Sequence, residues 1–184
     1  MTLLASCPAE LVIAARLFGA GVFVMAIYGK LRNWVPFTGI VANYRLLPAG
    51  SERLAAIIII AAEALVAASL ATGVALPYGG MLGIALLLGF AMAMAIAMAR
   101  GDRTIDCGCF QSSLRQTLGP ILILRNLVLA GLLLPVLAAT QPLGGAIALI
   151  DGVGAGLTLL LLNAAIATMI AVRDANARLR ERLG

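Results

Sequence analysis

Long apolar runs separated by short polar segments make up most of the chain. A lipid bilayer is crossed by a helix of roughly 17–25 residues, and five runs meet that length: residues 11–28, 54–75, 81–99, 120–139 and 152–172. Only helices and closed barrels satisfy their backbone hydrogen bonds in lipid, and the alternation of a barrel strand is missing from this sequence. The pattern therefore predicts an all-α, polytopic membrane helix bundle of about five transmembrane helices, with residues 1–184 forming a single integral membrane domain.

Composition supports a membrane protein. Hydrophobic residues make up 62% of the chain and charged residues 11%, whereas a soluble domain is about 45–50% apolar and about 25% charged. We therefore expect the lipid bilayer to be a main partner. The chain has a net charge of +5. We expect this positive charge to lie on the face of the protein that meets anionic lipid headgroups, so it does not indicate nucleic-acid binding.

Basic residues gather in alternate loops. The predicted loops at residues 76–80 and 140–150 contain none, while the other two loops and the tail contain the following: Lys30, Arg32, Arg45, Arg53, Arg100, Arg103, Arg115, Arg173, Arg178, Arg180 and Arg182. Cytoplasmic loops of membrane proteins carry an excess of lysine and arginine. This rule predicts an external N-terminus, a cytoplasmic C-terminus and a cytoplasmic third loop.

The first of the basic loops also contains aromatic residues and two prolines. We expect a short amphipathic helix around residues 35–46 that lies at the membrane interface. The arginine-rich tail is expected to extend the fifth span as a helix.

Four residues that need a specific reason to lie inside a membrane fall within the predicted spans: Arg16, Glu63, Arg125 and Asn163. Such residues are rare in membranes and are functional candidates by default. Either Arg16 or Arg125 is expected to reach toward Glu63, forming a structural ion pair, a proton relay or a substrate contact. Arg125 and its neighbour Asn126 could instead serve the third loop, and Asn163 is expected to form an interhelical hydrogen bond.

The third loop contains the segment IDCGCFQ, with Cys107 and Cys109 one residue apart. The chain has no histidine, and the remaining cysteine, Cys7, is predicted on the other side of the membrane. A structural metal site takes about four ligands, so no metal is assigned, although a two-thiolate site for a soft ion stays open.

Gly108 permits the close approach of Cys107 and Cys109 that a disulfide requires. A ring this small should be strained, and strained disulfides exchange readily. The alternative is a pair of unreactive thiols.

An ordered set of motifs resembles the methylamine utilisation MauE family of DoxX-like membrane proteins. The matching elements are Arg16, YGKLRN at residues 28–33, NYRLLP at 43–48, Glu63, RGDRTIDCGCF at 100–110 and LRN at 124–126. The family usually has glycine after the phenylalanine, where this chain has Gln111. That difference concerns the turn after Phe110 and leaves both cysteines in place.

The resemblance implies a role in maturing exported, disulfide-containing proteins together with a thioredoxin-like partner. We therefore predict a thiol–disulfide redox protein of the bacterial inner (cytoplasmic) membrane, possessing oxidoreductase chemistry at Cys107 and Cys109. Glu63, Arg125, Asn126 and Arg16 are the supporting residues. No cofactor is predicted, and a quinone is the one candidate left open. The alternative function is a small transporter or channel for a soft metal or a thiol compound.

Overall fold

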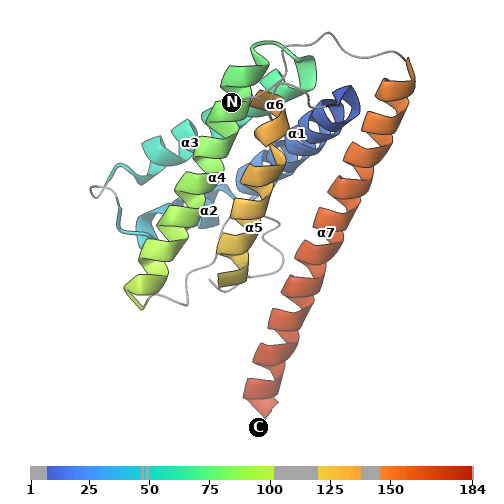
Figure 1. The fold of residues 1–184 in the computed structure, drawn as a ribbon. Helices are drawn as coiled ribbons and strands as arrows, with labels where there is room; N and C mark the ends of the chain where they lie inside the picture. The colour runs from blue at the N-terminus through green and yellow to red at the C-terminus, as the bar shows by residue number, and fades with distance from the viewer. Residues whose placement is uncertain (1–7, 47, 49, 102–119, 138–145, 184) are drawn as a thin grey trace.

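The computed structural model describes residues 8–46, 48, 50–101, 120–137 and 146–183, and all regular structure within them is helical (Figure 1). The helices are α1 (Ala9–Arg32), α2 (Trp34–Asn43), α3 (Glu52–Thr72), α4 (Leu76–Ala99), α5 (Pro120–Leu132), α6 (Leu134–Leu137) and α7 (Ala146–Leu183).

Within the part of the chain that the structure describes, five helical segments are long and apolar enough to cross a membrane. They are α1, α3, α4, the combined α5–α6 segment Pro120–Leu137, and Ile147–Met169 within α7. The predicted membrane helix bundle of about five spans is thus confirmed. Cys7, Cys107 and Cys109 lie outside the described residues, as does most of the third loop.

Glycine and proline mark the helix boundaries. Helix α3 ends at Gly73, whose φ of 81° is left-handed and whose N–H donates to the carbonyl of Ser69. Glycine adopts this conformation without the steric cost that a Cβ would bring. Helix α5 is separated from α6 at Leu133. Pro135 follows directly and has no N–H with which to continue the helical hydrogen bonds.

Helix α1 is the centre of the bundle and packs most extensively on α7 and α3. Arg16 of α1 contacts Leu70 of α3, and Lys30, further along α1, contacts Glu63, which comes earlier in α3, so these two helices are antiparallel. Gly152 of α7 approaches Ile13, and Gly21 of α1 approaches Leu160, so α1 and α7 run in the same direction. This is the arrangement required of the first and last of five spans.

The main hydrophobic core lies between α1, α3, α4 and α5–α6. Its largest fully buried apolar side chains include Phe23, Leu70 and Leu133. Many large apolar side chains point outward instead, such as Leu161 on α7 and Met92 on α4. Lipid rather than water is the natural surrounding for such outer faces.

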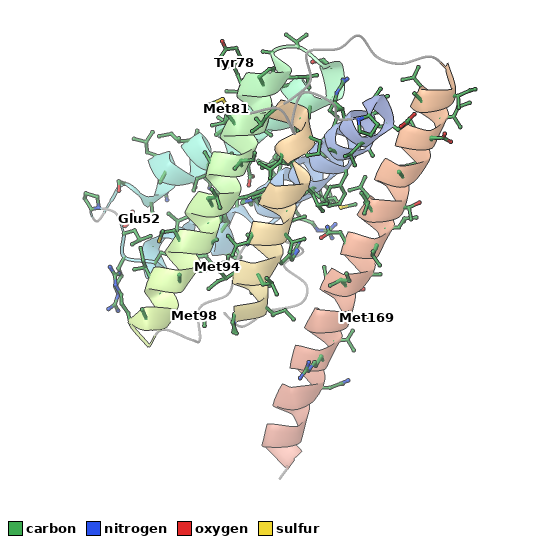
Figure 2. The ribbon with its side chains drawn as sticks, in the orientation of Figure 1. Glu52, Tyr78, Met81, Met94, Met98 and Met169 are labelled. Atoms are coloured by element: carbon green, nitrogen blue, oxygen red, sulfur yellow. The ribbon has the colours of Figure 1, made fainter. Side chains whose placement is uncertain are left out.

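Helix α2 closes one end of the bundle. Phe37 and Val41 pack with Ala56 of α3, while Ile40 and Tyr44 pack beside a cluster formed by Met94 and Ala97 of α4 and Leu122 of α5. Helix α2 therefore covers the end where α3 begins, α4 ends and α5 begins, which we call the α2 end. Figure 2 shows Met94 and Met98 toward this end of α4, and Tyr78 and Met81 toward its other end.

The amphipathic helix expected around residues 35–46 is therefore present at Trp34–Asn43. The helical tail is also confirmed, because α7 continues for 38 residues, to Leu183. At about 1.5 Å per residue this is far longer than one bilayer crossing, and Figure 1 shows α7 extending beyond the other helices.

Candidate functional site

A buried ion pair joins α1 to the middle of α3. Lys30 Nζ donates a hydrogen bond to Glu63 Oε1 over 2.6 Å, and the two side chains are 2% and 1% exposed. Lys30 lies in the last turn of α1. Its long side chain carries the ammonium group away from the helix end and into the bundle, where the only oppositely charged side chain within salt-bridge distance in the described structure is Glu63.

The expectation that Arg16 or Arg125 pairs with Glu63 is wrong. Arg16 Nε donates to the carbonyl oxygen of Leu70, and Arg125 Nε donates to Asn163 Oδ1. Hydropathy places Lys30 in the first loop because the apolar run ends at residue 28, whereas α1 continues to Arg32 in the structure. The sequence contained a signal for this pairing, since a glutamate in mid-span stays charged only beside a cation, and a lysine two residues past an apolar run can turn inward.

Two aromatic rings flank the ammonium group. Lys30 Nζ lies 5.6 Å from the ring centroid of Phe37 in α2 and 5.4 Å from that of Phe90 in α4. A cation within about 6 Å of an aromatic face is attracted by the ring quadrupole. The ion pair therefore draws together side chains from four helices, α1 to α4.

The second carboxylate oxygen of Glu63 has different surroundings. Oε2 is buried and has no hydrogen-bond partner among the residues that the structure describes. A buried acceptor without a donor carries an uncompensated desolvation cost of about 1–3 kcal/mol, and more when it is charged. Glu63 Oε2 is therefore a hydrogen-bond acceptor inside the protein that, within the described structure, remains available to a donor.

Arg16 serves the other end of the bundle. Its hydrogen bond to Leu70 O is 3.2 Å long, and its guanidinium lies so close to Gly73 that a Cβ built there would be 2.6 Å from Nη2. The last carbonyls of a helix have no intrahelical donor, and a cation there also interacts favourably with the helix dipole. Arg16 therefore caps α3 and takes no part in the ion pair.

Arg125 and Asn163 join α5 to α7. Their hydrogen bond, 3.4 Å from Arg125 Nε to Asn163 Oδ1, confirms the interhelical bond expected for Asn163. Asn126 is buried and donates to Leu122 O of its own helix. Since Gly83 of α4 approaches Leu133 in the antiparallel pairing of α4 with α5–α6, Asn126 lies at about the level of Phe90.

The cysteine pair falls in residues 102–119, outside the described structure, but the preceding residues are placed. Arg100 Nη1 donates to the carbonyl oxygens of Tyr44 and Arg45, over 3.2 and 3.4 Å. The segment that contains Cys107 and Cys109 therefore starts from the α2 end of the bundle. Arg32, Arg45, Arg53 and Arg100 are all exposed there.

Comparison with known proteins gives a consistent result. The family model "Methylamine utilisation protein MauE" matches residues 8–139. The relatives include proteins of the same name from Paracoccus denitrificans, 41% identical over 67% of this chain and 66% of that protein, and from Paracoccus versutus, 39% identical over 81% of each. A third, from Methylorubrum extorquens, is 39% identical over 74% of this chain and 75% of its own length. No solved structure matches.

Proposed function

The chain belongs to the methylamine utilisation protein MauE family, and on this premise we propose that it is a membrane thiol–disulfide redox protein that assists maturation of exported, disulfide-containing proteins. The process served would be methylamine utilisation, after which the relatives are named. The observation that carries the proposal is the Cys107–Gly108–Cys109 sequence, which lies within the matched region and between two membrane spans.

The proposed chemistry is thiol–disulfide exchange with a thioredoxin-like partner. A thiolate of the partner attacks one sulfur of the Cys107–Cys109 disulfide, which forms a mixed disulfide and releases the other cysteine as a thiolate. The second partner thiolate then attacks the mixed disulfide. The partner leaves oxidised, and Cys107 and Cys109 remain as the reduced pair.

The proposed location is the bacterial inner membrane, with the α2 end in the cytoplasm. The exposed arginines at that end support this orientation, because cytoplasmic loops carry an excess of basic residues. Lys30 is buried and does not contribute to that excess. The clients would lie on the opposite side. A membrane-soluble carrier or a partner that reaches the α2 end would have to connect the two.

Replacing both cysteines tests the function. In cells that carry Cys107→Ser with Cys109→Ser, the client should accumulate with unpaired thiols, which alkylation and gel mobility would measure. Cys7→Ser is the matched control and should leave client disulfides unchanged. Normal client disulfides in the double variant would exclude the redox function.

A transporter without redox chemistry is the second candidate. The buried Lys30–Glu63 pair favours it, because intramembrane charges often mark substrate or ion pathways. The two functions respond differently to the same variant. A transporter would keep its activity without Cys107 and Cys109 and would lose it when Lys30 or Glu63 is replaced.

A further inference from the structure

The Lys30–Glu63 pair lies in the half of the bundle where α4 ends and α5 begins, on either side of the cysteine segment in the sequence. Helix α2 covers this half, Phe37 of α2 flanks the ammonium group, and Arg100 connects the start of the cysteine segment to the end of α2. Thiol exchange itself makes no use of a buried ion pair. The pair therefore calls for a separate role.

The chemistry of the site is specific. An ammonium donor and a carboxylate oxygen without a partner in the described structure lie side by side, between two phenylalanine rings that come from different helices. Phe37 is buried, whereas Phe90 is partly exposed on α4, a predominantly apolar helix. Phe90 therefore connects the buried ion pair to the outer surface of α4.

We propose that this site binds the headgroup of a membrane quinone, which reoxidises the Cys107–Cys109 pair. A quinone is planar and lipid-soluble, so it can enter from the bilayer beside Phe90 and stack on the aromatic rings. One quinone carbonyl accepts a hydrogen bond from Lys30 Nζ. After reduction, the corresponding hydroxyl donates to Glu63 Oε2, the oxygen that has no other donor among the described residues.

The proposed step balances. The two cysteine S–H bonds break, one S–S bond forms, and two electrons and two protons leave the thiols. The quinone takes up these electrons and protons and becomes a hydroquinone with two new O–H bonds. The inference rests on the proposed function, because the thiols are the reductant, and it supplies the oxidant that restores the disulfide after each exchange.

Quinone binding can be measured without the thiol reaction. The full chain carrying Cys107→Ser and Cys109→Ser, in lipid nanodiscs, is titrated with a short-chain benzoquinone and binding is followed by calorimetry. We expect saturable binding to this protein. Adding Lys30→Met or Phe90→Leu should weaken binding about tenfold or more, as expected for loss of a charged hydrogen bond or an aromatic contact.

The matched controls are Arg53→Met, an exposed cation, and Tyr78→Leu, an exposed aromatic residue at the other end of α4. Both should bind as the parent does. Because Lys30→Met could affect folding, Phe90→Leu provides the independent comparison, since it keeps the ion pair. Equal binding by the Phe90→Leu and Tyr78→Leu proteins, or no binding by the parent, would overturn the proposed site.

The wild-type chain then tests the reaction. After reduction and removal of the reductant, one benzoquinone should be consumed for every two thiols lost, as followed by quinone absorbance and alkylation. Consumption of quinone without loss of thiols, or no consumption at all, would overturn the proposed step. Because exchange between the Cys107–Cys109 disulfide and a thioredoxin-like dithiol is measured separately, such a result would leave the proposed function standing.

Discussion

At the scale of single residues, the feature with the largest energetic cost of burial is the pair of charged side chains Lys30 and Glu63. Both are almost fully buried, and each is the other's counter-ion. Removing one partner of a buried pair typically costs about 3–5 kcal/mol, because the remaining charge is left uncompensated, whereas replacing both with apolar residues is often nearly neutral.

This asymmetry predicts the stability of three variants. Lys30→Met and Glu63→Leu should each lower the free energy of unfolding by about 3–5 kcal/mol, while the double variant should recover most of that loss. Unfolding in mixed micelles would measure the effect. Arg53→Met, which removes an exposed cation, should change stability by less than about 0.5 kcal/mol. Additive losses in the double variant would contradict a direct pair.

Gly73 provides a second test at this scale. Its φ is 81° and a Cβ would meet the Arg16 guanidinium, while Gly50 has a φ of 91° with no atom within 4 Å of such a Cβ. Gly50→Ala should therefore cost only the left-handed strain of about 1–2 kcal/mol. Gly73→Ala should cost more, because Arg16 must also move. Equal losses, measured by thermal unfolding, would exclude a capping role for Arg16.

Reasoning from the sequence identified the buried polar residues at this scale but not all of their partners. Arg16, Glu63 and Asn163 stood out because each interrupts an apolar run, and all three are buried. Lys30 was overlooked because hydropathy does not record which way a long side chain turns. The partner of Glu63 depends on how α1 and α3 pack, which is a tertiary property.

At the scale of helices, hydropathy predicted the five spans well and their ends less well. The first span was ended at residue 28, although α1 continues to Arg32, because polar residues can extend a helix beyond its apolar part. The break between α5 and α6 was also missed. Pro135 was its signal, but a proline inside a membrane span can be accommodated without an interruption.

The packing of α7 on α1 predicts a contrast between two glycines. A Cβ at Gly152 would lie 2.7 Å from Ile13 and 3.0 Å from the carbonyl oxygen of Glu10, whereas a Cβ at Gly154 would have no atom within 4 Å. Gly152→Val should therefore force the helices apart and cost about 1–3 kcal/mol. Gly154→Val should have little effect. Thermal unfolding of the two proteins side by side would show whether α7 packs through Gly152.

At the scale of the whole molecule, orientation is the main prediction that still awaits a test. The chain lacking its native cysteines would carry a single new one, either Asn43→Cys at the α2 end or Val74→Cys at the opposite end. Asn43 and Val74 are exposed in the structure. In intact cells, a membrane-impermeant maleimide should label the Val74→Cys protein and leave Asn43→Cys unlabelled. The reverse pattern would invert the proposed topology.

The chemistry of the cysteine pair could be proposed from sequence alone, because Cys107, Gly108 and Cys109 are adjacent and their spacing needs no tertiary information. Their setting could not, since it depends on helices that are distant in the chain. Helix α2 and Arg100 place the origin of the cysteine segment, and these contacts link residues more than fifty positions apart.

Trapping the exchange intermediate tests the central claim most directly. In membranes that contain the oxidised thioredoxin-like partner, the lone Cys107 thiolate of Cys109→Ser should attack the partner's disulfide, which is the reverse of the proposed exchange. The mixed disulfide should accumulate, because Cys109 is no longer present to attack it and release the partner as a dithiol. Non-reducing gels would show the adduct, and dithiothreitol should release it. The same adduct should be absent when Cys107 is also replaced by serine. If the Cys109→Ser and Cys107→Ser single variants both form no mixed disulfide, the chain does not act by thiol–disulfide exchange.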